Sequence, residues 1–451
     1  MEKQGKRRRR VVLVPAPFQG HINPMLQLGS ILHSNGFSIT VVHAQYNSPN
    51  PSIHPDFSFL PLPDTSSDHN ILAGDLIAFV LQLNTNCKAR LQECFAQVMR
   101  QQGPDDGIAC VVHDEIMYFS EAAAKDLKLP SIVLRTASAA TFLARNALIN
   151  LKAEGHIPFP ESRSLDSVPE LIPIRFKDLP LPIFGKLEDT LQLVSKVANI
   201  RTSLAIIYNT IDCLENSSLA KLQQQCQVPS FPIGPMHSFA PASSTSLLEE
   251  DNSCLAWLDQ QSCNSVIYVS LGSIAFMDVK QVVEMAWGLV NSQQPFLWVV
   301  RPGSIRGAEW IEILSKNLKE SISERGYIVK WAPQKEVLAH SAVGGFLSHC
   351  GWNSTLESIC EGVPMICRPS FEDQRVNARY VSHVWNVGLE LESELERGEI
   401  ERVVRRLMVD EEGKDMRKRG KNLKERIELC IKEGGSSNNS LNKLIEMIVS
   451  I

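Results

Sequence analysis

The chain has 451 residues, of which 44% are hydrophobic and 21% charged, as expected for a globular protein long enough to form two domains. The formal net charge of −5 gives no overall positive field for nucleic acid, so the basic run at residues 3–10 is interpreted as a solvated tail, with a nucleic-acid or membrane-surface role as the alternative. Eleven scattered cysteines without CxxC pairs disfavour a disulfide framework, and no apolar run reaches the roughly 18 residues of a membrane helix, so we expect a cytoplasmic protein without a membrane span.

In the first half of the chain, short hydrophobic runs alternate with stretches of helical spacing. Strands are predicted at residues 11–14, 37–43, 108–112, 131–134 and 205–209, and helices at 24–36, 73–99, 115–127 and 136–153. A proline-rich loop is predicted at 158–189. This alternation is typical of a parallel, doubly wound α/β sheet.

A segment rich in proline and serine, residues 229–252, is interpreted as the region of an interdomain linker. A second α/β series follows it, with strands predicted at 265–270, 295–301, 327–330 and 343–348 and a helix at 278–291. Helices are predicted in the last part of the chain at 399–408, 413–432 and 437–451. The sequence therefore predicts two α/β halves.

Two candidate catalytic residues of the first half follow predicted strands. In open parallel sheets, ligands bind beyond the carboxyl ends of the strands, where the strand order reverses. If the strand at 11–14 lies beside the strand at 108–112, His21 and Asp114 become neighbours, and the carboxylate fixes the imidazole tautomer and raises its basicity. The alternatives are a His21 that only caps a helix or lines a loop, and an Asp114 that caps the following helix.

Residues 331–374 contain a candidate nucleotide site. The strand at 343–348 leads into His349, a glycine turn and a helix start, where unpaired backbone N–H groups form an anion site. Ser354 and Glu357 have the spacing of a capping box, which is the alternative explanation for Glu357. Trp331 fits either stacking on a base or core packing, and helix capping is the alternative for Asp373.

These residues together resemble a known enzyme family. Residues 331–374 begin with WAPQ, contain HCGWNS and end with DQ, and they are similar to the nucleotide-sugar signature box of plant family 1 UDP-glycosyltransferases. PFQGHINP near the start and SLGS in the second half occur in the family's order. The resemblance implies a GT-B type fold, in which two Rossmann-like domains face each other across a cleft.

The resemblance also implies the domain limits and the role of each site residue. We expect an acceptor domain at 1–240, a linker at 241–252, a UDP-sugar domain at 253–435 and a final helix at 436–451 that packs back on the first domain. His21 is implied as the catalytic base, with Asp114 as its partner. The implied donor-binding residues are Ser273, Trp331, Gln334, His349, Trp352, Asn353, Ser354, Glu357, Asp373, Gln374 and Thr136. The acceptor is expected near Phe18, Met117, Phe119 and Thr141.

The activity expected from the resemblance is that of an inverting glucosyltransferase, which moves glucose from UDP-glucose to a hydroxyl, or alternatively a carboxyl, of a small lipophilic acceptor such as a flavonoid or terpenoid. No metal is expected, because His349 takes the place that a divalent cation fills in other transferases; a monomer is also expected. The competing classes are a nicotinamide-dependent oxidoreductase and a non-catalytic ligand-binding protein. The first is disfavoured because FQGHIN stands where GxGxxG would be needed.

Overall fold

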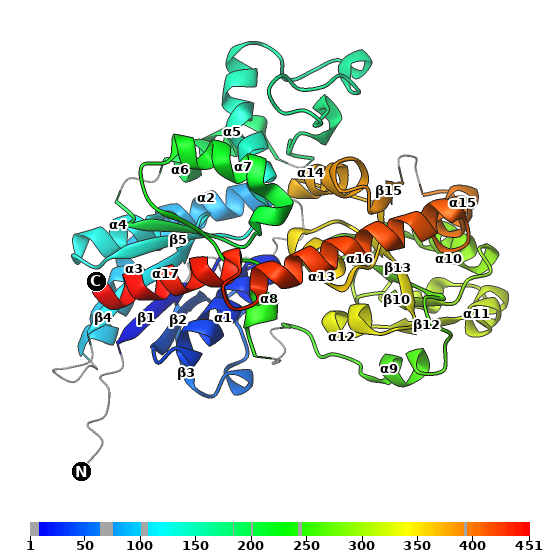
Figure 1. Ribbon diagram of the computed structural model, residues 1–451, viewed down its shortest axis with the longest axis horizontal. Coiled ribbons are helices and arrows are strands. Elements are labelled where there is room, and N and C mark those ends of the chain that lie inside the picture. Colours follow the sequence, from blue (N-terminus) through cyan, green and yellow to red (C-terminus); the bar gives the residue numbers. More distant parts are fainter. Residues whose placement is uncertain are drawn as a thin grey trace. The chain divides into compact units, whose positions relative to one another are not determined.

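The computed structural model describes residues 9–63, 75–100, 107–183, 185–199, 202–241, 246–391 and 395–451. The chain divides into two compact units (Figure 1). Unit 1 comprises Met1–Pro160, Leu181–Leu247 and Leu429–Ile451, and unit 2 comprises Glu161–Pro180 and Leu248–Glu428. The segment Glu161–Pro180, which the predicted limits leave in the N-terminal domain, therefore groups with the C-terminal one. The predicted linker at 241–252 includes the change of unit after Leu247, and its residues 242–245 lie outside the described residues.

Unit 1 is built on a seven-stranded parallel sheet with the order β3-β2-β1-β4-β5-β6-β7. Its strands are β1 (Arg10–Val14), β2 (Ser38–Ala44), β3 (Phe57–Leu62), β4 (Ile108–Asp114), β5 (Ser131–Arg135), β6 (Ala205–Tyr208) and β7 (Ser230–Pro232). Residues 11–14 of β1 are fully buried. A parallel strand that is covered on both faces reads as a continuous apolar run, which is why the sequence predicts the central strands well.

The helices of unit 1 cover both faces of this sheet (Figure 1). They are α1 (Gln19–Ser34), α2 (Leu76–Asn86), α3 (Lys88–Arg100), α4 (Phe119–Asp126), α5 (Ala139–Ala153), α6 (Leu187–Ala198), α7 (Asp212–Gln225), α8 (Met236–Phe239) and α17 (Ser436–Ser450). The last helix, α17, buries Leu441, Leu444 and Ile448 in the same hydrophobic core as β1 and α1. The end of the chain is therefore part of the N-terminal unit.

Unit 2 contains a six-stranded parallel sheet with the order β12-β10-β8-β13-β14-β15. Its strands are β8 (Val266–Ser270), β10 (Phe296–Val299), β12 (Gly326–Val329), β13 (Val343–Ser348), β14 (Met365–Cys367) and β15 (Gly388–Glu390), and β9 (Met277–Asp278) pairs with β11 (Ile305–Arg306). Its helices are α9 (Ser253–Leu258), α10 (Val279–Asn291), α11 (Lys316–Ser323), α12 (Gln334–Ala339), α13 (Trp352–Glu361), α14 (Asp373–Arg379), α15 (Arg397–Met408) and most of α16 (Glu411–Ile431).

Several elements differ from the sequence prediction. The described part of the single helix expected at 73–99 is two helices, because the chain leaves the first helix at Cys87. A strand, β3, occupies a proline-rich stretch for which no element is predicted. It is an edge strand, where Pro61 is tolerated. The first helix begins at Gln19 rather than at Pro24, so His21 lies in a helical turn and not in a loop.

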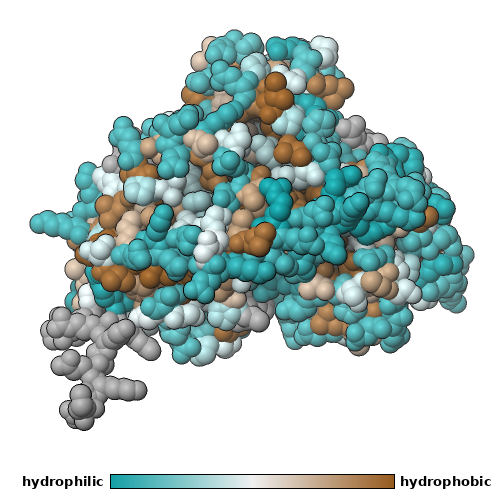
Figure 2. Space-filling model, viewed as in Figure 1, coloured by the Kyte–Doolittle hydropathy of each residue, from teal (hydrophilic) through white to brown (hydrophobic). Residues whose placement is uncertain are grey.

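The surface of the face shown in Figure 2 is mostly hydrophilic, with hydrophobic side chains in small groups. Among the described residues, Ile172 is the most exposed large hydrophobic side chain, at 79%. No helix in the described part of the chain is both long and apolar enough to cross a membrane.

Candidate active site

The candidate base His21 lies in the first turn of α1, and Asp114 is the last residue of β4. Because β1 pairs with β4 in parallel, both residues lie at the carboxyl edge of the sheet, which is the juxtaposition expected from the sequence. The Nδ1 atom of His21 is 2.8 Å from Oδ2 of Asp114, whose side chain is fully buried, whereas 25% of the His21 side chain is exposed. The Ile116 N–H donates to Oδ1 of Asp114. Asp114 does not cap the next helix, which begins only at Phe119.

The surroundings of His21 raise its pKa above the ordinary value. Burial acts to lower this pKa, but the charge and hydrogen bond of Asp114, together with the charge of Glu115, outweigh burial. Because Nδ1–H donates to Asp114, the lone pair on Nε2 is the basic site of the ring. The Thr136 hydroxyl lies 3.0 Å from Nδ1, so the structure brings this residue to the base. A contact between Thr136 and the donor sugar stays a prediction.

A second buried carboxylate, Glu115, was missed by the sequence analysis. Its side chain is 1% exposed and lies 3.3 Å from Arg145 Nη1 and 3.5 Å from Arg135 Nε. Burial raises the pKa of Glu115, while Arg145 and Arg135 act to lower it. A charged residue directly after Asp114, at the end of an apolar strand, was the available signal. Glu115 and the two arginines therefore form the electrostatic background of the His21–Asp114 pair.

The four residues expected near the acceptor lie in different surroundings. Phe18 is next to the base, with its ring centroid 5.9 Å from that of His21. Met117, Phe119 and Thr141 are buried in unit 1, with 0%, 4% and 0% exposure. The hydroxyl and N–H of Thr141 are both hydrogen-bonded to the Ser138 hydroxyl at the start of α5.

Two further aromatic side chains, which the sequence analysis did not single out, continue from Phe18. The Phe79 ring lies 6.2 Å from the Phe18 ring, and the Tyr46 ring lies 5.6 Å from the Phe79 ring. We call Phe18, Tyr46 and Phe79 the aromatic group. Through Phe18, this group places the edges and faces of aromatic rings beside His21.

In unit 2, β13 ends at Ser348 and α13 begins at Trp352, with Gly351 as its N-cap. His349 stands in this turn, close against Gly272, where a Cβ atom would lie only 2.5 Å from His349 Nε2. Burial lowers the pKa of His349 to about 4, although a backbone hydrogen bond at Ser270 opposes this effect. The buried Nδ1 atom has no hydrogen-bond partner within the described residues. A neutral imidazole and the first turn of a helix therefore stand together, and the N–H groups of a first turn point toward the helix start.

Gln334, Ser354 and Glu357 form one hydrogen-bonded group. The amide Nε2 of Gln334 donates to Ser354 Oγ at 2.9 Å and to Glu357 Oε2 at 2.7 Å. Burial raises the pKa of Glu357 to about 7, against the effect of the Gln334 hydrogen bond. The capping box considered for Ser354 and Glu357 is absent, because α13 begins before Ser354, at Trp352, and no side chain caps it.

Of the residues expected at the sugar, Asp373 and Gln374 lie at the start of α14, Trp352 lies at the start of α13, and Thr136 lies in unit 1. Gln374 Oε1 accepts from the N–H groups of Ser370 at 2.8 Å and Phe371 at 3.2 Å, and Asp373 Oδ2 accepts from Asn377 at 3.1 Å. Trp352 is 4% exposed. Trp331, Asn353 and Ser273 are partly exposed. The structure thus brings the predicted donor residues of unit 2 to the carboxyl ends of β8, β12, β13 and β14 and to the helices that follow them.

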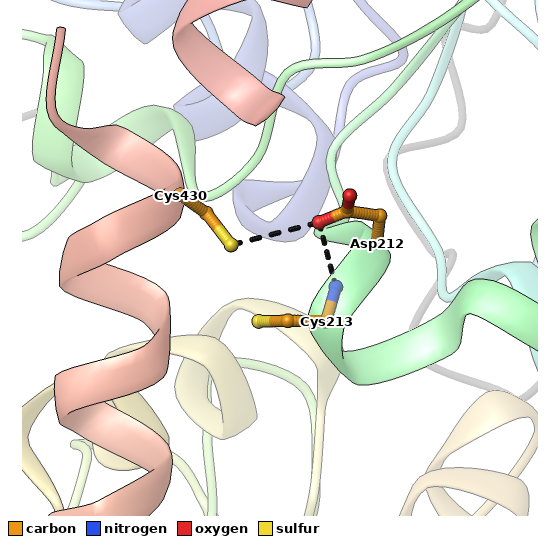
Figure 3. Close-up of side chains that lie close together, drawn as sticks. All are labelled: Asp212, Cys213 and Cys430. Atoms are coloured by element: carbon orange, nitrogen blue, oxygen red, sulfur yellow. Dashed lines mark hydrogen bonds between the residues drawn. The ribbon is translucent and has the colours of Figure 1, made fainter. Parts of the chain in front are cut away.

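A separate group of thiols and a carboxylate lies in unit 1, where Asp212, Cys213 and Cys430 converge (Figure 3). Their donor atoms lie within 4.8 Å of one another. Oδ1 of Asp212 already accepts from the Cys213 N–H, the Ser436 hydroxyl and the Cys430 thiol. The group therefore connects the end of α16 and the start of α17 to α7. The absence of a catalytic metal stays a prediction.

Residues 72–419 match the family model described as UDP-glucoronosyl and UDP-glucosyl transferase. The chain is 53% identical to UDP-glycosyltransferase 76E1 of Arabidopsis thaliana over 451 residues, 99% of each chain. It is 51% identical to flavonol 3-O-glucosyltransferase UGT76E12 of the same plant, over 98% of this chain and 97% of that relative. Among solved structures, Phytolacca americana UGT2 complexed with UDP-2fluoro-glucose and pterostilbene superposes with a TM-score of 0.82 at 27% identity, covering 98% of this chain and 100% of that one.

The architecture agrees with these similarities. Both units are α/β domains with parallel sheets, as in GT-B glycosyltransferases. The structure of TcCGT1 in complex with UDP superposes with a TM-score of 0.81 at 26% identity, covering 98% of this chain and 99% of that chain. A nicotinamide-dependent oxidoreductase and a non-catalytic binding protein, the two alternatives from the sequence, receive no support. The chain belongs to the plant family 1 UDP-glycosyltransferases, which are enzymes of the GT-B fold class.

Proposed function

We propose that the protein is an inverting glucosyltransferase that transfers glucose from UDP-glucose to a hydroxyl of a small lipophilic acceptor such as a flavonoid. A terpenoid alcohol or a carboxyl group is a further acceptor in this proposal. The observation that carries it is the buried Asp114 carboxylate, 2.8 Å from the partly exposed ring of His21. A hydroxyl needs a base to become a nucleophile, and an imidazole oriented by a carboxylate is suited to that task near neutral pH.

In the proposed reaction, Nε2 of His21 takes the proton of the acceptor hydroxyl. The acceptor oxygen attacks the anomeric carbon on the face opposite the diphosphate and forms the new C–O bond. The bond between the anomeric carbon and the diphosphate breaks, and UDP leaves with the electron pair. Inversion turns the α-linked donor into a β-glucoside. The negative charge of Asp114 stabilises the imidazolium that this transfer creates.

The developing charge on UDP is stabilised by the N–H groups at the start of α13 and by His349. With a pKa of about 4, the ring of His349 is neutral near pH 7 and has a single N–H. It can donate to the diphosphate only if this proton moves from the nitrogen that bonds the Ser270 backbone to Nδ1, whose hydrogen-bonding capacity is unused among the described residues. To become half protonated at pH 7 it would need a bound diphosphate to raise its pKa by about three units, or about 4 kcal/mol. His349 therefore replaces a divalent cation through its hydrogen bond rather than through a full positive charge.

The hydrogen-bonded group of Gln334, Ser354 and Glu357 is proposed to hold the nucleoside end of the donor. The Glu357 carboxylate is suited to accept from the two ribose hydroxyls, and Gln334 orients it from 2.7 Å. Trp331, partly exposed after β12, is proposed to stack on the uracil. The start of α14, with Asp373 and Gln374, is proposed to contact the hydroxyls of glucose.

The acceptor class is supported by the aromatic group and by one relative. The rings of Phe18, Phe79 and Tyr46 are in successive contact, starting beside His21. Aromatic rings favour a flat aromatic molecule through edge-to-face and stacked contacts. The relative named flavonol 3-O-glucosyltransferase is 51% identical to this chain. A flavonol is therefore the first acceptor to test. We also propose that the enzyme is cytoplasmic, monomeric and independent of metal ions.

The proposal is tested by incubating the protein with UDP-glucose and a panel of flavonols, terpenoid alcohols and aromatic acids. The expected result is release of UDP, a product heavier than the acceptor by one hexose unit, and a β-linkage by NMR. UDP-galactose and UDP-glucuronic acid in the same assay test the donor. An α-linked product, or preferred use of another sugar nucleotide, would overturn the proposal.

A further inference from the structure

Within unit 2, four charged side chains join the segment Glu161–Pro180 to α14 and β15. Arg175 binds Asp178 at 2.8 Å and Glu390 at 2.6 Å. Arg379, the last residue of α14, lies 3.8 Å from Asp178 and 3.6 Å from Glu390. We call these four residues the charge cluster. Two positive and two negative groups thus alternate in contact, and the charge of Arg375 also acts on Asp178.

The charge cluster is largely removed from solvent, since its side chains are exposed by 11%, 6%, 15% and 16% in the order Arg175, Asp178, Arg379 and Glu390. Burial acts to raise the pKa of Glu390, but hydrogen bonds from Ser382 and Arg175 lower it below its usual value. Removing one member of such a group leaves a buried charge without its partner, which is more costly than losing a surface ion pair. The segment is therefore fixed on unit 2 by interactions that tolerate little displacement.

The point of attachment is the helix that begins with the proposed sugar contacts. Arg379 Nε also donates to the Pro173 carbonyl at 2.9 Å, so the far end of α14 is bound directly to the segment. Asp373 lies only six residues before Arg379, about 9 Å along a helix. Asn377, between them, donates to the Cys350 carbonyl at 3.0 Å and to Asp373 at 3.1 Å. Arg379 and Asn377 thus hold α14 at two points, against the segment and against the turn at Cys350.

The turn that leads into α14 is strained. Glu372 has φ 55° and ψ −130°, a conformation that residues other than glycine rarely adopt. Strain of this kind persists only where the surroundings hold the chain on both sides, and it gathers at functional sites. The Gln374 side chain holds the N–H groups of Ser370 and Phe371 before the turn. After the turn, the support comes from α14 and, through Arg379, from the charge cluster.

We propose that Arg175, Asp178, Arg379 and Glu390 are positioning residues for the donor sugar: they hold α14 so that the strained turn at Glu372 presents Asp373 and Gln374 to the glucosyl group. This inference rests on the proposed sugar contacts of Asp373 and Gln374. It gives a segment from the N-terminal half of the sequence a part in donor binding. It also separates the sugar contacts of α14 from the proposed UDP contacts, which lie outside α14, at Trp331, in α12, and in the turn and helix at His349 and α13.

The test compares Glu390→Gln with wild type by calorimetry, using UDP and UDP-glucose separately and without acceptor. The ratio of the two dissociation constants isolates the contribution of the glucosyl group to binding. We expect the preference for UDP-glucose over UDP to fall about threefold to tenfold, the equivalent of one weakened hydrogen bond, while UDP affinity changes less than about twofold. The double variant Arg379→Gln/Glu390→Gln, which restores the charge balance, should recover part of the preference.

Glu284→Gln is the matched control. The Glu284 side chain is 16% exposed, like that of Glu390, and the substitution removes an ion pair with Arg397 elsewhere in unit 2. It should leave the preference unchanged. If Glu390→Gln lowers Tm but weakens UDP and UDP-glucose equally, or has no effect on their ratio, the positioning role is refuted. Asp373→Asn and Gln374→Asn separate the two proposals: if neither alters the ratio, the proposed sugar contacts themselves fail.

Discussion

Replacing Asp114 by asparagine tests the electrostatic part of the catalytic proposal. The substitution keeps the size of the side chain but removes the charge that faces His21 Nδ1 at 2.8 Å. The other oxygen can still accept from the Ile116 N–H, so the local backbone keeps its hydrogen bond. The new amide group can donate to Nδ1, which would place the ring proton on Nε2 and block the basic site. Asp114→Asn therefore tests orientation and charge together.

The magnitude follows from the hydrogen bond that is lost when the imidazolium forms. A buried hydrogen bond to a charged group contributes about 1.5 to 3 kcal/mol. If this contribution stabilises the transition state, kcat/KM should fall about 10-fold to 150-fold on a neutral phenolic acceptor. UDP affinity should be unchanged, since the proposed UDP contacts are in unit 2. An acidic acceptor should show a smaller loss, because it needs less help from a base.

The pH profile gives a second readout with a definite sign. Asp114 and Glu115 raise the pKa of His21 in the wild type, and the ring must be neutral to accept a proton. Wild-type kcat/KM should therefore fall as the pH decreases through a pKa above the ordinary histidine value. Without the charge of Asp114, burial acts with less opposition, so the midpoint of this fall should move to lower pH in Asp114→Asn.

The assay is UDP release at saturating UDP-glucose, measured across pH for wild type, Asp114→Asn and a control. Asp126→Asn is the control, because Asp126 is half exposed and pairs with Lys88 away from His21. Its kcat/KM should stay within about twofold of wild type. If Asp114→Asn also stays within about twofold and its acid-side midpoint does not move, the reasoning on this pair is wrong.

Three further predictions concern the donor site. Since the pKa of Glu357 is about 7, UDP should bind more tightly to the wild type as the pH rises from about 6 to about 8. The part of this change in UDP affinity that is lost in Glu357→Gln belongs to the Glu357 carboxylate. Identical calorimetric pH profiles for the two proteins would contradict the ribose contact. Gly272→Ala should lose about tenfold or more in UDP affinity, because Gly272 has φ 77° and its new Cβ would lie 2.5 Å from His349 Nε2. Gly398→Ala is the control and should bind UDP normally, since Gly398 has open space where a Cβ would lie. EDTA should leave the transfer rate unchanged, and recovery of a lost rate by Mg²⁺ or Mn²⁺ would refute the metal-free proposal.

The parts of the site that the sequence predicts are those set by chain topology. The apolar runs at 11–14 and 108–112 identify two central strands, and the parallel pairing of β1 and β4 then brings His21 to Asp114. The turn from β13 to α13 is similarly marked by its strand, its glycine and its helix start. In these cases a regular local pattern and a general rule for parallel sheets are sufficient.

The parts that escape prediction depend on the tertiary environment. The spacing of Ser354 and Glu357 is that of a capping box, yet the helix begins earlier and Glu357 pairs with Gln334 instead. Nothing local to His349 reveals the burial that lowers its pKa to about 4. The attachment of Glu161–Pro180 to unit 2 depends on ion pairs between residues about 200 positions apart, such as Arg175 and Glu390. A single sequence carries no record of such pairings.

The most direct test of the central claim is single-turnover transfer by His21→Ala, with UDP affinity measured on the same protein. In the proposed mechanism, His21 of unit 1 removes the proton and residues of unit 2 bind the donor. His21→Ala should therefore lose at least about 100-fold in the rate of transfer to a neutral phenolic acceptor, while UDP binds as in wild type. Retention of more than about a tenth of the wild-type rate, with UDP bound normally, would contradict the assignment of His21 as the base.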